Sequence, residues 1–127
     1  MPRITTALAL LALASACGDG DEADALNVGA QCADSTDCDN SDDFTQTCLP
    51  QFTGGYCGLE GCASDLDCPE AAACIAHTDG VDYCFRTCID KPDCNANREP
   101  ALEANCSSNV VFVDGTQGRK ACVPPSG

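Results

Sequence analysis

Cysteine is the residue type in this chain that offers the most chemistry, and its thirteen copies divide into one plus twelve. Cys17 follows a short apolar run near the N-terminus, and the other twelve lie between Cys32 and Cys122 in three sets of four. A thiol can carry an acyl group, join a second thiol in a disulfide, or bind a metal as the thiolate. The odd total predicts that Cys17 has a role different from that of the even set.

The N-terminus has the pattern of a secretory signal peptide, in which Arg3 precedes an apolar segment from Ala7 to Ala14. That segment is too short to span a bilayer. The run Leu13-Ala14-Ser15-Ala16-Cys17 resembles the bacterial lipobox, although Ala14 stands where Leu is commonest. The lipobox implies cleavage before Cys17 and acylation of its thiol. Ordinary signal peptidase could instead cut at the same place, but the free thiol left behind would be prone to mixed disulfides in an oxidising compartment.

The twelve remaining cysteines predict a small disulfide-rich fold. They make up about 13 % of residues 32–122, above the roughly 8–10 % that marks a disulfide scaffold. The chain has two Tyr, four Phe and no Trp, so we expect covalent closure to replace a continuous apolar core. The formal net charge of −14 makes nucleic acid and anionic lipid surfaces poor partners.

The three cysteine sets repeat one spacing. In each set five residues separate the first cysteine from the second, an aspartate precedes the second, and another acid follows the first by two or three positions. Because Asp side chains accept hydrogen bonds from nearby backbone N–H groups, we expect these aspartates to fix a turn between the two cysteines. The aspartates before the second cysteines are Asp37, Asp67 and Asp93, and the other acids are Asp34, Asp65 and Asp90.

The second half of each set has the pattern of a β-hairpin. Asp79-Gly80 predicts a two-residue turn that places Ile75 opposite Cys84, so that Cys74 and Cys84 face opposite sides of the ribbon. A two-residue turn at Asp114-Gly115 likewise places Ser107 opposite Cys122. In the first set a three-residue loop, Thr53-Gly54-Gly55, would keep the last two cysteines on opposite faces. Because the third and fourth cysteines of a set then point to opposite faces of the hairpin, we expect bonds from the first to the third and from the second to the fourth cysteine. Sequence alone leaves other pairings open. The predicted pairs are Cys32–Cys48, Cys38–Cys57, Cys62–Cys74, Cys68–Cys84, Cys88–Cys106 and Cys94–Cys122.

Metal binding is the alternative to disulfides. No Cys-x2-Cys pair occurs in the chain, and export to an oxidising space favours bridges over zinc or iron–sulfur ligation, so we expect no cofactor. Calcium is a further possibility because five carboxylates crowd into ten residues, but their spacing does not match the calcium-binding helix-loop-helix pattern, and a solvated acidic loop is the favoured interpretation. The five are Asp34, Asp37, Asp39, Asp42 and Asp43.

Catalytic motifs are missing from the sequence. The one histidine, His77, falls within a predicted strand, and no Gly-x-Ser-x-Gly elbow, His-Glu-x-x-His pair, Cys-x-x-Cys pair or glycine-rich phosphate loop accompanies it. We therefore expect a protein that is not an enzyme and has no catalytic residues.

The spacing of the second set resembles that of a known family. The run Cys62-Ala-Ser-Asp65-Leu-Asp67-Cys68, followed by Cys74, Cys84 and Cys88, resembles the N-terminal cysteine-rich region of the Dickkopf family, and also the cysteine-rich repeat lipoproteins of myxobacteria. The first set departs from this pattern by a longer second gap. Because a shared fold does not carry function, the resemblance implies only secretion and disulfide bonding.

Together these patterns predict a fold of three tandem four-cysteine modules, each a turn plus a short β-hairpin, with little other regular secondary structure. The expected divisions are a lipoprotein signal peptide (1–16), an acidic flexible tether (17–30) and modules at 31–57, 58–84 and 85–127. We expect a lipid-anchored protein of the bacterial cell envelope, at the outer membrane or cell surface, that binds an unidentified protein or glycan or serves adhesion or envelope structure. The alternatives are a calcium-binding protein and a small hydrolase inhibitor presenting loop 49–55 or 95–105.

Overall fold

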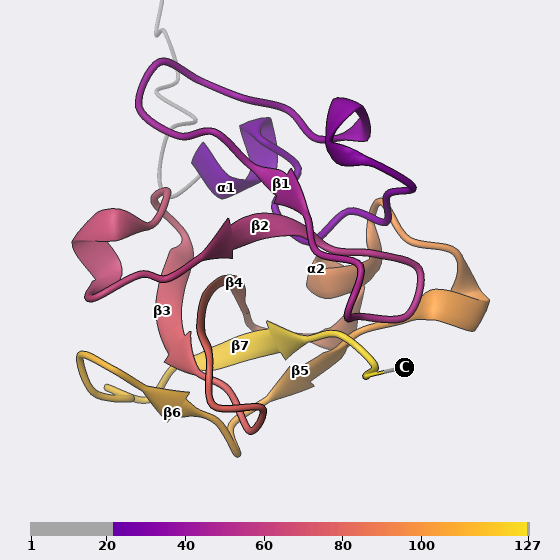
Figure 1. The fold of residues 1–127 in the computed structure, drawn as a ribbon. Coiled ribbons are helices and arrows are strands. Elements are labelled where there is room, and N and C mark those ends of the chain that lie inside the picture. Colours follow the sequence, from indigo (N-terminus) through magenta and orange to yellow (C-terminus); the bar gives the residue numbers. More distant parts are fainter. Residues whose placement is uncertain (1–21, 127) are drawn as a thin grey trace, which may run out of the picture.

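The computed structural model describes residues 22–126 as a small disulfide-rich fold of short antiparallel strands and turns (Figure 1). The strands are β1 (Thr47–Cys48), β2 (Cys57–Glu60), β3 (Ala72–Ala76), β4 (Asp82–Cys88), β5 (Asn105–Ser107), β6 (Val111–Phe112) and β7 (Lys120–Val123). The helical segments are α1 (Glu22–Ala25), α2 (Lys91–Asn95) and the 3-10 turns η1 (Ser35–Asp37), η2 (Asp65–Asp67) and η3 (Pro100–Leu102).

Each cysteine set contributes one pair of antiparallel strands, and further pairings join the sets. The pairs within the sets are β1 with β2, β3 with β4, and β5 with β7. Strand β4 also pairs with β2 and β7, and β3 pairs with β6. The expected module boundaries after residues 57 and 84 fall inside β2 and β4, so consecutive sets share a strand and lie side by side in one network (Figure 1).

Six disulfides close the three sets, and they are the six pairs that the spacing predicts: Cys32–Cys48, Cys38–Cys57, Cys62–Cys74, Cys68–Cys84, Cys88–Cys106 and Cys94–Cys122. The Cα atoms of the first and third cysteines are 5.9 Å apart in every set. Those of the second and fourth are 5.4–5.5 Å apart. One local geometry therefore recurs three times along the chain.

The pairing was predicted from a hairpin with a two-residue turn, and the register of that predicted hairpin is wrong. The chain between β3 and β4 turns through three residues, Thr78 to Gly80, because the His77 N–H donates to the Val81 carbonyl and Gly80 has a φ of +86°. This turn places Cys74 directly opposite Cys84, so both lie on one face of the ribbon. Each is nevertheless bonded to a cysteine from the preceding turn.

The other two predicted loops also differ from the structure. Cys48 lies opposite Cys57, and six residues, 50–55, separate the last hydrogen-bonded pair, Leu49 and Tyr56. In the third set Cys106 lies opposite Cys122, because residues 110–113 do not pair with the last strand as expected. Val111 and Phe112 of this segment form β6, which pairs with β3, and a long loop then leads to β7.

A shared apolar core underlies the strands, contrary to the expectation that cross-links would replace one. Phe52 and Phe85 contact each other, and each also contacts Tyr56 and Tyr83, at ring-centroid distances of 5.2–6.0 Å. Phe112 belongs to the same buried cluster. The few aromatic residues come from all three sets and converge between them. Each edge-to-face pair adds about 0.5–1.5 kcal/mol beyond the burial of its area.

The segment expected to be a flexible tether is folded where the structure describes it. Ala23, Leu26 and Val28 are buried in the shared core, and the Ala23 N–H donates to the Glu70 carbonyl at 2.9 Å. Asp24 also forms an ion pair with Arg86. Residues 22–30 are therefore part of the domain; residues 17–21 of the predicted tether lie outside the described part of the chain.

Candidate functional site

The aspartate before each second cysteine fixes the turn that leads to it. One carboxylate oxygen accepts the two backbone N–H groups three and four residues earlier, at 3.3 and 2.8 Å for Asp37, 3.3 and 2.8 Å for Asp67, and 3.1 and 2.9 Å for Asp93. The predicted structural role of these three aspartates is confirmed. The two hydrogen bonds that each carboxylate accepts hold the first two cysteines of each set in place.

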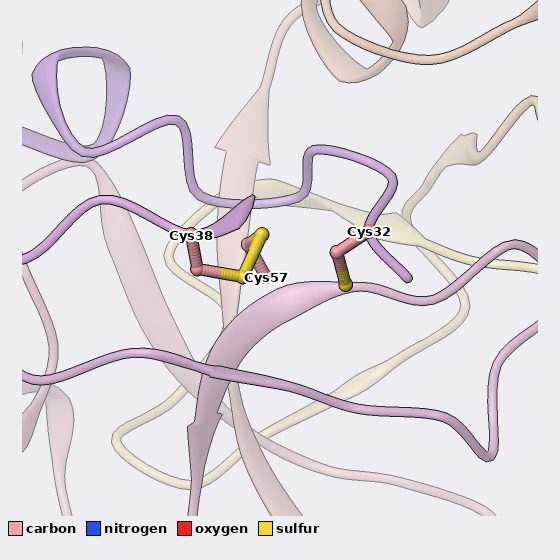
Figure 2. Close-up of side chains that lie close together, drawn as sticks. All are labelled: Cys32, Cys38 and Cys57. Carbon is pink, nitrogen blue, oxygen red and sulfur yellow. A yellow bond between two sulfur atoms is a disulfide. The ribbon is translucent and has the colours of Figure 1, made fainter. Parts of the chain in front are cut away.

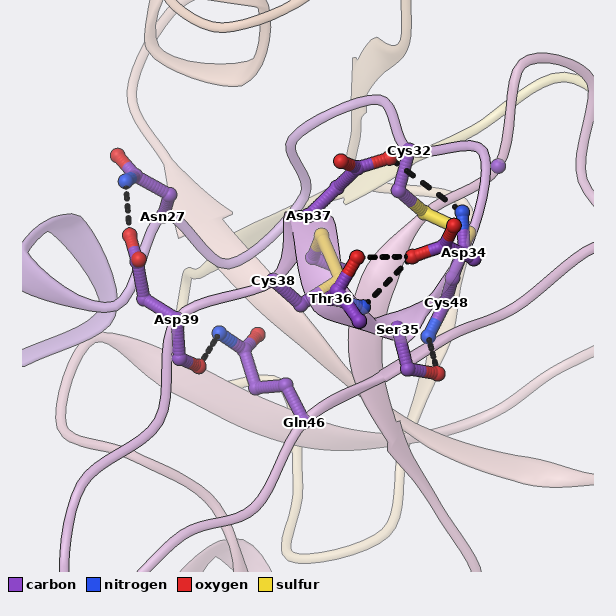
Figure 3. The surroundings of a disulfide bond; sticks show 12 residues. Asn27, Cys32, Asp34, Ser35, Thr36, Asp37, Cys38, Asp39, Gln46 and Cys48 are labelled. Atoms are coloured by element: carbon purple, nitrogen blue, oxygen red, sulfur yellow. Dashed lines mark hydrogen bonds between the residues drawn. A yellow bond between two sulfur atoms is a disulfide. The ribbon is translucent and has the colours of Figure 1, made fainter.

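The second acid of the repeat is used differently in the first two sets, and the side chain of Asp90 in the third set makes no cap hydrogen bond. Asp34 accepts hydrogen bonds from the Thr36 hydroxyl and N–H, and these lower the pKa of its carboxyl (Figure 3). Ser64, and not Asp65, takes this capping place in the second set. Asp65 instead accepts from the Cys74 N–H at 2.9 Å and pairs with Arg119 at 3.0 Å, which ties the second set to the third.

Three sulfur atoms meet in each set. The Sγ atoms of the first, second and fourth cysteines lie within 4.8 Å of one another. Figure 2 shows the side chains of this group in the first set, Cys32, Cys38 and Cys57. Across residues 22–126, these three cysteine triads are the groups of three or more Cys, His, Asp or Glu whose ligand atoms come that close. Every sulfur in these triads is part of a disulfide, and a thiolate is the form that binds metal. The triads instead place the two disulfides of each set next to each other.

The five candidate calcium ligands do not converge. Asp34 accepts from the Thr36 N–H and Asp37 from the Ala33 N–H. Asp39 accepts from the side-chain amide of Asn27 (Figure 3). Asp42 and Asp43 are exposed in the loop before β1. Their oxygens do not form a group of three within 4.8 Å in the part of the chain that the structure describes.

His77 lies just beyond β3, half-buried beside the aromatic core. Its ring is edge-to-face with Phe52, Tyr83 and Phe85, at centroid distances of 5.5, 5.8 and 5.5 Å. Beside it, the Tyr83 hydroxyl donates to Asp79 at 2.6 Å. Burial and this bond raise the pKa of Tyr83; burial opposes ionisation of Asp79, but the bonds from Tyr83 and the Val81 N–H outweigh it and lower the pKa of that carboxyl. The His77 ring thus packs on the aromatic core, and the Tyr83–Asp79 hydrogen bond holds the turn beside it.

The two loops considered for inhibition contact each other instead of standing free. Arg98 is buried, and its guanidinium donates to the carbonyls of Thr53 and Gly55 at 2.9 and 2.7 Å. It also reaches the carbonyls of Gly29 and Leu102. A Cβ on Gly54 would lie 2.6 Å from Leu102, so the loops are closely packed. Loops 49–55 and 95–105 therefore stabilise each other.

A groove on the surface between the first two sets was not singled out from the sequence. Its volume is about 660 Å³, and it lies between the loop before β1, the end of β2 and the turn η2. Its lining combines four carboxylate side chains with three apolar ones, and no Lys or Arg is among its described lining residues. The carboxylates are Glu22, Asp43, Glu60 and Asp67, and the apolar residues are Phe44, Leu59 and Leu66.

A signal for this groove does exist in the sequence. Leu66 stands between two aspartates in a short polar turn, where a leucine has no core to join. The structure leaves its side chain 91 % exposed.

The other residue expected to be functional, Cys17, lies outside the described residues.

The comparisons with known proteins give no relative. No family model, no curated protein and no solved structure matches this chain. The six disulfides fit an oxidising extracellular environment. Within residues 22–126, the structure contains no helix long and apolar enough to cross a membrane.

Proposed function

We propose that this chain is a non-enzymatic binding module, displayed in an oxidising extracytoplasmic space and anchored to a bacterial membrane through lipid on Cys17. The observation that supports this most directly is how the polar groups are used. The repeated aspartates cap turns, Arg98 links two loops, and His77 packs on aromatic rings, whereas the groove around Leu66 stays open. In residues 22–126 these polar groups are thus used to hold the fold, and the open groove supports a role in binding.

The folding of residues 22–30 bears on where such a module stands. Four residues separate Cys17 from Glu22, and a fully extended chain advances at most about 3.6 Å per residue, so the five steps between the two Cα atoms reach no more than about 18 Å. An acylated Cys17 would therefore hold the folded domain directly at the membrane surface. Two or more acyl chains would make this attachment stable, since one chain alone binds only marginally.

The anchor is tested by fractionating cells that express the full chain or its Cys17→Ser variant. We expect the unmodified chain in the membrane pellet, released by detergent, and the variant in the soluble fraction with its twelve other cysteines still paired. Equal distribution of the two proteins would contradict lipid anchoring.

The binding function is tested by chemical cross-linking on intact cells that display the full chain. We expect one discrete adduct, whose mass and sensitivity to protease or glycosidase tell whether the partner is protein or glycan. Recovery of the uncross-linked chain alone, over a range of cross-linker lengths, would contradict the proposal.

The two alternatives receive less support from the geometry. A calcium site would need carboxylate oxygens to converge, and those of Asp34, Asp37 and Asp39 are directed to backbone and amide donors. An inhibitor would need a protruding loop, and the loops at 49–55 and 95–105 are joined through Arg98.

A further inference from the structure

The groove between the loop before β1 and the turn η2 presents an apolar side chain on a rigid support. Leu66 is 91 % exposed, yet its turn is closed at both ends by the disulfides of Cys62 and Cys68. The Asp67 carboxylate holds the same turn through the N–H groups of Ala63 and Ser64. Because the side chain is presented by a constrained turn, a partner that covers it loses little conformational entropy of this chain.

The floor of the groove continues this apolar surface inward. Phe44 and Leu59 are half-buried and pack against the shared core, so their exposed parts face the groove beside Leu66. An apolar side chain of a partner placed here would remove its own surface and that of all three residues from water. Burial of this kind contributes roughly 25 cal/mol per Å².

The charge around this surface is of one sign. Two of the four carboxylates are already engaged, since Glu22 accepts the Glu70 N–H at 2.8 Å and Asp67 caps η2. Asp43 and Glu60 are exposed on the rim. A partner that fills the groove must therefore bring positive charge to at least these two positions. A second copy of this chain, at a formal net charge of −14, would be repelled.

We infer that this groove binds a segment of a partner protein in which an apolar side chain is flanked by Lys or Arg side chains. The apolar side chain lies against Leu66, Phe44 and Leu59, and the flanking cations pair with Asp43 and Glu60. This inference rests on the proposed binding function and names the chemistry of the partner.

A labelled peptide, acetyl-Lys-Leu-Lys-Leu-Lys-amide, tests the inference by titration against the full chain in detergent. We expect Leu66→Ala to weaken binding about fivefold, because the buried leucine surface is lost. Glu60→Gln should weaken it about threefold, and added salt should weaken it further, as for a solvent-exposed ion pair.

The chain provides a matched control for each substitution. Ile89 is 80 % exposed in the corresponding turn of the third set, and Glu99 is an exposed glutamate before η3, so Ile89→Ala and Glu99→Gln should leave the affinity unchanged. A peptide with Glu in place of Lys should not bind. Equal weakening by the control variants, or binding of the acidic peptide, would overturn the inference, as would an affinity that Leu66→Ala does not change.

Cross-linking on cells separates the failure of this inference from failure of the proposed function. If the cell-surface adduct forms equally with the Leu66→Ala variant, the groove is not the binding site, but the binding function stands. If no adduct forms with the unmodified chain, the proposed function fails whatever the peptide does. Loss of the adduct in Leu66→Ala, with retention in Ile89→Ala, would support both.

Discussion

The guanidinium of Arg98 donates a 2.7 Å hydrogen bond to the carbonyl oxygen of Gly55, 43 residues earlier in the chain. The same side chain reaches the carbonyls of Gly29, Thr53 and Leu102, so one residue of the third cysteine set holds loops of the first. Burial lowers the pKa of Arg98, but an arginine stays charged at any ordinary pH. The charge is accommodated by four carbonyl oxygens.

Replacing Arg98 should therefore destabilise the protein strongly. Arg98→Ala leaves these carbonyls without donors, and we expect the free energy of unfolding to fall by about 3 kcal/mol. Arg98→Lys should recover only part of this loss, because an ammonium group cannot reach several carbonyls in the same fork geometry. Denaturant unfolding with the disulfides intact measures both. Lys91→Ala, which breaks an exposed ion pair with Glu103, is the control and should change stability by less than about 1 kcal/mol.

Acid should weaken the domain through the aspartates that accept hydrogen bonds. The N–H groups of Asp90 and Ile89 hold the pKa of Asp93 below its usual range. A depressed folded-state pKa gives stability that is present above the unfolded value, near 3.9, and is lost as the pH falls through the folded value. We expect the free energy of unfolding of Asp93→Asn, measured by denaturant titration, to fall less steeply as the pH is lowered than that of the unmodified chain. Asp42→Asn, which removes an exposed carboxylate of the loop before β1, is the control and should follow the unmodified chain. The same pH dependence in Asp93→Asn and the unmodified chain would contradict the assignment.

Base should act through Tyr56. Burial raises its pKa to about 12, and the Arg86 N–H donates to its hydroxyl at 3.2 Å. The unfolded tyrosine ionises near 10, so the contribution of the neutral hydroxyl is complete below that pH and is lost as the pH rises through about 12. Tyr56→Phe should show a shallower loss of stability over this range. Ultraviolet titration should show an ionisation near pH 12 in the unmodified chain that Tyr56→Phe lacks, while Tyr83, whose pKa is also raised, still ionises late in both; an ionisation near pH 12 that persists in Tyr56→Phe would refute this.

The sulfur triads predict disulfide exchange in single-cysteine variants. Cys48→Ser frees Cys32, whose sulfur lies within 4.8 Å of those of Cys38 and Cys57. The Cys32 thiolate can attack the Cys38–Cys57 disulfide, forming a bond to one of its sulfurs and releasing the other as a thiolate. Peptide mapping after an acid quench should detect Cys32 bonded to Cys38 or Cys57. Cys32→Ser instead frees Cys48, which is outside the triad, and should show no exchange; the same isomers in both variants would contradict the account.

The disulfide pairs could be predicted from the sequence, but for a reason that the structure does not support. The Asp79-Gly80 pair indicated a turn without specifying its length, and one more residue in the loop reverses which cysteines face each other. The pairing depends instead on the preceding turns, where Asp37, Asp67 and Asp93 fix the first two cysteines of each set. These local hydrogen bonds could be predicted because all their partners lie within four residues.

Long-range packing could not be predicted in the same way. Residues 22–30 are acidic and glycine-containing, and that composition concealed the buried positions Ala23, Leu26 and Val28. The shared aromatic core and the role of Arg98 depend on contacts between residues more than twenty positions apart, which spacing alone does not reveal. The groove also needs all three of its walls, so Leu66 alone could only hint at it.

The most direct test of this account is the intact mass of the full chain purified from membranes, measured with thiol alkylation before and after reduction. We predict a chain that begins at Cys17 and carries acyl mass, with no alkylation before reduction and twelve alkylated cysteines after it. A chain that lacks acyl mass, or thiols that react without reduction, would contradict a lipid-anchored domain closed by six disulfides.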